Sequence, residues 1–166
     1  MKREDLLIEK LNLAAHPEGG YYKETYRSTG TIHKNNLSES YGGDRNFCTS
    51  IYFLLKSDSF SAFHKINQDE TWHFYEGSTI TIHQISPDGI YSKVILGNTI
   101  LNDHFPQYTV PGGYWFGATV NEKNSYSLVG CTVSPGFDFD DFQLAKRNEI
   151  QKKFPNHKNI IEELTR

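Results

Sequence analysis

Short runs of alternating apolar and polar residues make up most of this chain. Residues 79–85 alternate most regularly, with Ile80 and Ile82 on one side and Thr81 and His83 on the other. A two-residue period of this kind is typical of strands that bury one face. Further strands are expected at residues 21–28, 48–55, 91–96, 107–110 and 125–133. The pattern therefore predicts an all-β core.

Turns and helices are predicted between and around these strands. The tripeptide Pro87-Asp88-Gly89 is a hairpin turn signal that returns residues 91–96 onto residues 79–85. The polar residues 29–45 are expected to form a loop or a frayed hairpin. Helices are expected near the two ends of the chain, at residues 3–13, 142–153 and, as a last turn or two, 160–164. This order favours a barrel or sandwich in one domain that spans residues 1–166.

The composition agrees with this fold and narrows the function classes. Aromatic residues make up 14% of the chain and there are 13 glycines, as expected of a β-rich fold with many turns. A formal net charge of -3 gives no reason to expect nucleic acid or an anionic membrane as a partner. The first residues lack the apolar core of a signal peptide, so a cytoplasmic location is expected. Cys48 and Cys131 are interpreted as small buried residues, with a disulfide or a catalytic thiol as the alternatives.

Residues 63–77 carry the most chemically informative pattern. They contain two histidines and three carboxylates among aromatic side chains. His64 and Glu70 flank a polar turn, so they are predicted to face each other across two antiparallel strands. Gly77 is expected to end the second strand at a tight turn. A histidine paired with a carboxylate in an aromatic pocket can transfer protons, and a purely structural buried pair is the alternative.

This spacing resembles the first motif of the cupin superfamily, G-x5-H-x-H-x3,4-E-x6-G. His64 stands at its first histidine, Glu70 at its glutamate and Gly77 at its closing glycine, while Ile66 occupies the position of the second histidine. The second cupin motif, G-x5-P-x-G-x2-H-x3-N, is matched only in part, because Phe116 stands where its histidine is expected.

Other segments resemble one uncharacterised cupin subfamily, known as cupin 5 or DUF985. These segments are residues 16–20 (HPEGG), 69–73 (DETWH) and 133–139 (VSPGFDF). The resemblance implies a cupin double-stranded β-helix, or jelly roll, with short N- and C-terminal helices. It also implies a homodimer, since cupins commonly pair through their sheet edges.

The resemblance bears on metal binding, because metal-dependent cupins usually hold their ion with three histidines and one glutamate. Here Ile66 and Phe116 replace two of those ligands, and two ligands do not make a tight transition-metal site. No cofactor is therefore expected, and a divalent metal stays open as the alternative. In that case His64, Glu70 and His73 are the candidate ligands, although strict alternation places His73 on the face opposite Glu70.

A second resemblance concerns residues 20–26 (GYYKETY). This segment is similar to a strand of the dTDP-4-dehydrorhamnose 3,5-epimerases, which are metal-free cupins that act on a nucleotide sugar. The resemblance implies that Tyr22 and Glu24 contact a nucleotide and that His64 is the catalytic base, with Glu70 as its partner. Gly19 replaces the arginine that contacts the pyrophosphate in that family. Epimerisation beside a carbonyl needs a base for a carbon-bound proton and a donor for the enolate oxygen.

The leading interpretation is a metal-independent sugar or nucleotide-sugar epimerase or isomerase with a small-molecule pocket in the barrel. The alternatives are a non-catalytic cupin that binds a sugar or nucleotide, and a metal-dependent cupin enzyme, so whether the protein is an enzyme stays open. His16 is interpreted as a turn residue, and the simplest interpretation of Glu18 is a solvated carboxylate. The residues expected to bind the ligand are Tyr22, Glu24, Tyr52, Trp72, Trp115 and Phe116.

Overall fold

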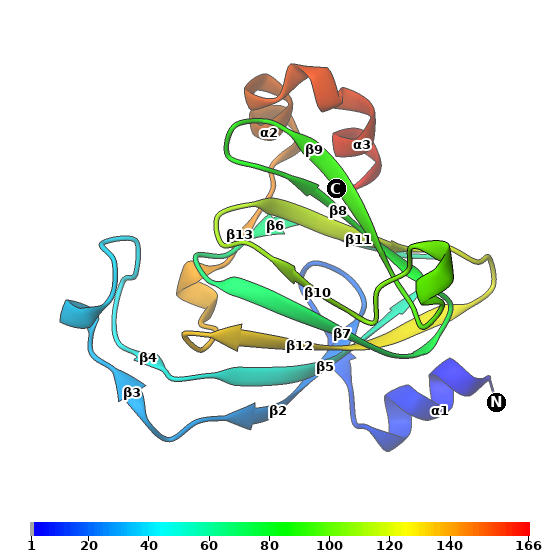
Figure 1. The fold of residues 1–166 in the computed structure, drawn as a ribbon, viewed down its shortest axis with the longest axis horizontal. Coiled ribbons are helices and arrows are strands. Elements are labelled where there is room, and N and C mark those ends of the chain that lie inside the picture. Colours follow the sequence, from blue (N-terminus) through cyan, green and yellow to red (C-terminus); the bar gives the residue numbers. More distant parts are fainter. Residues whose placement is uncertain (1) are drawn as a thin grey trace.

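Two antiparallel sheets lie face to face in the structure (Figure 1), which is a computed structural model that describes residues 2–166. The six-stranded sheet has the order β1 (Ala14–Ala15), β2 (Tyr21–Arg27), β5 (Thr49–Lys56), β12 (Tyr126–Ser134), β7 (Asp69–Gly77) and β10 (Gln107–Val110). The five-stranded sheet has the order β13 (Gln143–Leu144), β6 (Phe60–Lys65), β11 (Trp115–Val120), β8 (Ile80–Ile85) and β9 (Tyr91–Leu96). A separate two-stranded ribbon pairs β3 (Thr31–Ile32) with β4 (Arg45–Asn46).

Helices flank the sheets at both ends of the chain. They are α1 (Arg3–Lys10), α2 (Arg147–Lys153) and α3 (Lys158–Glu163), with short 3-10 helices η1 (Lys34–Asn36), η2 (Ile100–Asn102), η3 (Phe139–Asp141) and η4 (Pro155–His157). Figure 1 shows α2 and α3 together beyond the five-stranded sheet, and α1 beside the six-stranded sheet on the other side of the molecule. None of the helices in residues 2–166 has the length and apolar character needed to cross a bilayer.

Strand alternation divides the apolar side chains among three layers. In β5, Phe53 and Leu55 belong to the core between the sheets, whereas Leu54 lies in an outer cluster with Leu7 of α1. A second outer cluster packs the five-stranded sheet against α2 and α3, and it contains Phe63, Ile85, Trp115, Ile150 and Ile161. Each sheet is therefore covered on its outer face, and the space between the sheets is left for the main core and for a cavity.

The all-β cupin architecture predicted from the sequence is confirmed, and the hairpin of β8 and β9 forms as expected. The helix predicted over residues 142–153 is wrong in its first part. Residues 143–144 form β13 on the edge of β6, so α2 begins only at Arg147. The unpaired backbone N–H and C=O groups at the edge of β6 bind residues 143–144, and this pairing outweighs the weak helix propensity of a few residues. Residues 29–45, predicted as a loop or a frayed hairpin, contain β3, η1 and the start of β4, and β3 pairs antiparallel with β4.

The strands that carry His64 and Glu70 belong to different sheets. β6 pairs with β11 and β13, whereas β7 pairs with β12 and β10. The prediction that His64 and Glu70 face each other across a pair of adjacent strands is therefore wrong in detail. The polar turn between them carries the chain from one sheet to the other, so the two side chains come from different sheets.

β7 ends at Gly77, as the sequence predicts. The glycine has φ +101°, which L side chains rarely adopt, and a Cβ there would lie 2.3 Å from the carbonyl oxygen of Tyr126. A side chain at this position would therefore disturb both the turn into β8 and the neighbouring strand β12.

Candidate functional site

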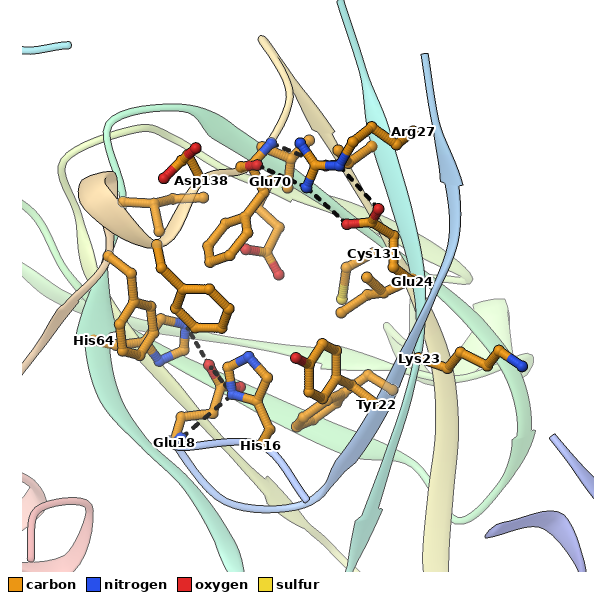
Figure 2. A pocket seen from close by; sticks show the side chains of 18 of the residues that line it. His16, Glu18, Tyr22, Lys23, Glu24, Arg27, His64, Glu70, Cys131 and Asp138 are labelled. Carbon is orange, nitrogen blue, oxygen red and sulfur yellow. Dashed lines mark hydrogen bonds and ion pairs between the residues drawn. The ribbon is translucent and has the colours of Figure 1, made fainter. Parts of the chain in front are cut away.

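A cavity of about 660 Å³ lies between the two sheets (Figure 2). Much of its wall is aromatic, formed by Tyr22, Phe53, Trp72, Phe137, Phe139 and Phe142. Its titratable interior groups are His16, Glu18, His64, Glu70 and Cys131. A cavity of this size, mainly apolar with a few convergent polar groups, is typical of a small-molecule site.

One side of the cavity is closed by residues 137–142, and a buried ion pair holds this segment. Arg45 Nε and Nη2 donate to the two carboxylate oxygens of Asp141, each over 2.7 Å, and Gln68 donates to the same group over 2.7 Å. Burial raises the pKa of Asp141, but these hydrogen bonds, led by that from Arg45, hold it below the ordinary value of 3.8. Asp138 caps η3 by accepting from the Asp140 N–H.

Glu18 and His64 form a buried hydrogen-bonded pair in the cavity wall. His64 Nδ1 lies 2.8 Å from the Ala62 carbonyl oxygen, and because a carbonyl only accepts, Nδ1 carries a proton. His64 Nε2 lies 3.1 Å from Glu18 Oε2, and the Ser61 hydroxyl donates to Glu18 Oε1 over 2.8 Å. Burial raises the pKa of Glu18 and lowers the pKa of His64. Both shifts place the shared proton on Glu18 and leave the pair uncharged.

His16 reaches the same carboxyl group from the loop before β2. Its Nδ1 accepts the backbone N–H of Glu18 over 3.3 Å and lies 3.4 Å from Glu18 Oε2. The imidazole and the Tyr22 ring are nearly perpendicular, with their centroids 4.6 Å apart. Burial lowers the pKa of His16 below its ordinary 6.5. The imidazole is therefore neutral at physiological pH.

Glu70 is a cavity carboxyl whose protonation changes near neutral pH. It is 8% exposed, and burial raises its pKa to about 7, with a smaller opposing effect from His64. The Cys131 thiol lies beside it, and burial raises the pKa of that thiol well above 9.0. The Trp72 indole N–H also lies close to Glu70, yet within residues 2–166 it has no hydrogen-bond partner of good geometry. Glu70 therefore has both its acid and its base form available at neutral pH.

Arg27 and Glu24, on the exposed side of the cavity, are bound to each other. Arg27 donates from Nε and Nη2 to the two carboxylate oxygens of Glu24, over 2.9 and 2.7 Å. Its Nη1 donates to Asn46 over 2.9 Å, and Nη2 also reaches the Phe137 carbonyl oxygen at 3.1 Å. Figure 2 shows Lys23 extending away from the cavity. Of the two cations in the cavity lining, Arg27 is therefore paired and Lys23 points away from the interior.

Five of the residues predicted from the sequence as site residues line the cavity, namely Tyr22, Glu24, His64, Glu70 and Trp72. The structure brings His64 and Glu70 to the same cavity but not into a direct hydrogen bond, because the partner of His64 is Glu18. Glu24 stands at the expected position, and its carboxylate is bound by Arg27 rather than free for a nucleotide.

The other three predicted ligand-binding residues do not line the cavity. Tyr52 lies on the outer face of β5 and packs edge-on against Tyr75, with centroids 6.1 Å apart. Trp115 belongs to the outer cluster under α2 and α3. Phe116 is buried in the core against His64, with ring centroids 4.1 Å apart. Side chains alternate along a strand, so Tyr52 and Trp115 point away from the cavity, whereas Phe116 points inward and is enclosed by the core.

The residues at the cupin metal positions do not fit a metal. Ile66 and Phe116 are buried apolar side chains, 2% and 1% exposed, and both nitrogens of His64 already have partners. His73 does not line the cavity, and its Nε2 lies 3.1 Å from Thr132 Oγ1. In the part of the chain that the structure describes, no three His, Cys, Asp or Glu side chains are arranged to hold an ion. The donor set of the metal-dependent cupins is therefore not reproduced.

His16 and Glu18 are the cavity residues that sequence reasoning missed. Instead of a solvated carboxylate, Glu18 is a buried group that is 6% exposed. The loop folds back at Gly19, which has φ +113°, and the Ala62 N–H donates to the Glu18 carbonyl over 2.8 Å. The HPEGG segment was the available signal, but side chains in a loop follow no periodic pattern that would show their direction.

The two cysteines are free thiols, so the disulfide alternative is wrong. Cys131 is buried, as predicted, whereas Cys48 is partly exposed. The pKa of Cys131 is raised well above 9.0, first by burial and then by the neighbouring Glu70 carboxyl. Cys131 is therefore a neutral wall residue at physiological pH, not a thiolate nucleophile.

Comparison with known proteins identifies similar chains. The sequence profile of the family described as "Cupin superfamily (DUF985)" matches residues 5–145. The uncharacterized protein YML079W of Saccharomyces cerevisiae is 32% identical over 155 residues, which cover 88% of this chain and 77% of the yeast protein.

Solved structures with similar folds agree with this match. Protein SO0799 from Shewanella oneidensis has a TM-score of 0.90 and 38% identity, covering 100% of this chain and 99% of its own. A hypothetical protein from Leishmania major has a TM-score of 0.89 and 35% identity, covering 97% of both chains. Oxalate decarboxylase from Bacillus subtilis has a TM-score of 0.54 at 14% identity and covers 90% of this chain but 36% of the enzyme, so it shows the shared fold alone.

Proposed function

The chain belongs to the DUF985 family of the cupin superfamily, and from the chemistry of its cavity we propose that it is a metal-independent epimerase or isomerase of an uncharged sugar or a similar hydroxy-carbonyl compound. The observation that carries the proposal is Glu70, a carboxyl group inside the cavity whose pKa is raised by burial to about 7. A group with this pKa can take and return protons at neutral pH, as acid–base catalysis at carbon requires.

Glu70 is assigned the role of base. Its carboxylate form takes the proton from the carbon beside the substrate carbonyl, the C–H electron pair forms a C=C bond, and the carbonyl oxygen becomes an enolate. Both nitrogens of His64 have partners, so His64 is less suited to this step than the sequence suggested. For isomerisation, the hydroxyl proton on the neighbouring carbon moves to the enolate oxygen, Glu70 returns its proton to the former carbonyl carbon, and the new C=O forms at the oxygen that lost its proton.

Epimerisation needs a proton from the opposite side of the enolate, and the Glu18–His64 pair is placed to supply it. Glu70 stands on β7 of one sheet, whereas His64 stands on β6 of the other. The proton shared by Glu18 and His64 lies in the same cavity as Glu70. Proton-carrying groups that come from different sheets favour delivery to the face of the enolate that Glu70 does not serve.

The charge of the lining favours an uncharged substrate over a nucleotide sugar. Arg27 is bound to Glu24, Asn46 and the Phe137 carbonyl, and Lys23 extends outward. A phosphate would therefore meet Glu70 without an unpaired cation to balance it, and burying an unpaired charge is costly. Aromatic walls, by contrast, suit the apolar faces of a sugar ring.

Deuterium exchange tests this function. The protein is incubated in D2O with a panel of uncharged aldoses and ketoses, and with nucleotide-linked keto sugars, and NMR follows deuterium entry at the carbon beside the carbonyl. We expect exchange with at least one uncharged sugar, its loss in Glu70→Gln, and its retention in Glu122→Gln, which alters an exposed carboxylate. If Glu70→Gln exchanges deuterium as fast as the wild type, Glu70 is not the base. If the wild type exchanges deuterium into none of the compounds, the proposal that the protein is an epimerase or isomerase is contradicted.

A second candidate is a non-catalytic binding protein, which the aromatic walls and the fully bonded imidazole of His64 also favour. In that case sugars raise the melting temperature of the wild-type protein and of Glu70→Gln alike, without deuterium exchange. A thermal-shift screen of the same panel separates the two candidates.

A further inference from the structure

The tautomer of His16 is fixed by its local geometry. The backbone N–H of Glu18 donates to His16 Nδ1 over 3.3 Å, so Nδ1 offers a lone pair and cannot carry a proton at the same time. The ring proton of the neutral imidazole therefore lies on Nε2. The proton shared by Glu18 and His64 does not compete for this position, because it lies between Glu18 Oε2 and His64 Nε2.

Aromatic packing fixes the direction of the same ring. The Phe139 ring stacks on the imidazole with centroids 6.1 Å apart, and the Tyr22 and Phe142 rings meet it edge-on at 4.6 and 5.9 Å. Within residues 2–166, no hydrogen bond occupies His16 Nε2, although Nδ1 is bonded. Figure 2 shows His16 with this second nitrogen directed toward the centre of the cavity. A rigid N–H donor thus faces the space where a ligand would lie.

We infer that the Nε2–H of His16 binds the carbonyl oxygen of the substrate and stabilises the enolate that forms there. This inference rests on the proposed function and adds to it the donor that proton abstraction needs. As Glu70 takes the carbon-bound proton, the electron pair of the broken C–H bond moves into the C=C bond and the former carbonyl pair moves to oxygen. The hydrogen bond from His16 then meets a full negative charge, and no proton leaves the imidazole.

A neutral imidazole suits this role for two reasons. The donor is held in place before the reaction by the Glu18 backbone and by its aromatic neighbours, so little reorganisation is needed when charge develops. The surroundings are also apolar and buried, where a hydrogen bond to an anion is stronger than in water. An uncharged donor requires no counter-ion inside the cavity, which agrees with a lining where Arg27 is paired with Glu24 and Lys23 points outward.

The first test reads the tautomer directly and does not depend on activity. Nitrogen NMR of histidine-labelled protein, with His16→Leu used to assign the signal, reports which ring nitrogen carries the proton. We expect the Nε2–H form and a ring that stays neutral at the ordinary histidine pKa of 6.5. A protonated Nδ1, or a cationic ring at that pH, would overturn the inference.

The second test compares His16→Leu, which removes the donor, with His16→Gln, whose side-chain amide can still donate. Exchange with the active sugar should fall about 100-fold or more in His16→Leu, as for the loss of one oxyanion donor, and about 10-fold or less in His16→Gln. The matched control is His33→Leu, because His33 is exposed, is bound to Asp44 and does not line the cavity. Equal rates in the wild type and His16→Leu would overturn the inference.

A third measurement keeps the inference testable if the protein proves to be a binder without turnover. The affinity for a ketose is compared with that for the matching alditol, which lacks the carbonyl. We expect the wild type to prefer the ketose and His16→Leu to lose that preference while its melting temperature stays close to that of His33→Leu. If His16→Leu still prefers the ketose, the role of His16 is overturned. If His16→Leu loses that preference but the wild type shows no deuterium exchange, catalysis is contradicted and the role of His16 in binding the carbonyl stands.

Discussion

Replacement of Glu70 by Gln is expected to stabilise the protein above neutral pH. The pKa of Glu70 rises from an ordinary 4.5 to about 7 because the carboxyl group is buried. The folded protein therefore binds more protons at this site than the unfolded chain between these two values, and stability falls as the pH rises through that window. Above the window the ionised carboxylate costs about 3 kcal/mol, at about 1.4 kcal/mol for each pKa unit.

Urea unfolding of the wild type and of Glu70→Gln, near pH 5 and near pH 8, measures this cost. The free energy of unfolding of Glu70→Gln relative to the wild type should rise by about 2–3 kcal/mol between the two conditions. His64, Glu18 and Cys131 also face Glu70, and their own pH dependence is largely cancelled by comparing the two proteins. Glu122→Gln, at an exposed site, should show no such rise. If the free energies of unfolding of Glu70→Gln and the wild type differ by the same amount near pH 5 and near pH 8, the raised pKa of Glu70 is refuted.

Three further changes test the surroundings of the site. Asp141→Asn leaves Arg45 as an unpaired buried cation and should lower the free energy of unfolding by about 3–5 kcal/mol in urea. Burial raises the pKa of Asp141, but hydrogen bonds led by that from Arg45 hold it below 3.8. The wild-type advantage should therefore persist above pH 3.8 and disappear as the pH falls below it. Glu18→Ala should cost about 2–4 kcal/mol because it leaves His64 Nε2 unbonded, whereas Glu18→Gln, whose amide can still donate to that nitrogen, should cost less than half as much by the same measurement. Gly77→Ala should lower the melting temperature, with a cost of about 1–3 kcal/mol in calorimetry, because φ is +101° there.

The strand pattern and the cupin motif were sufficient to predict the fold and part of the site. Alternation located β8, and the Pro87-Asp88-Gly89 turn gave its pairing with β9. The same alternation explains two of the errors in the predicted site. Phe53 faces the interior, so Tyr52 must face outward, and Trp115 and Phe116 are neighbours that cannot both enter one cavity. Phe116 does face inward, but it packs under His64 as part of the core.

The true partner of His64 could not be found by periodicity. Glu18 comes from a loop some distance away in the sequence, and its place beside His64 depends on the hydrogen bond between its carbonyl and Ala62 on β6. His16 in turn depends on the backbone of Glu18. Such contacts arise from tertiary packing, whereas the direction of a side chain in a strand is already fixed by its position.

The most direct test of the account is a carbon NMR titration of the glutamate side chains, in the wild type and in Glu70→Gln. The account predicts one carboxyl signal that titrates near pH 7 and is missing from the variant, because burial raises the pKa of Glu70 to about 7. A Glu70 signal that titrates near its ordinary value of 4.5 would contradict a base poised for proton transfer in this cavity.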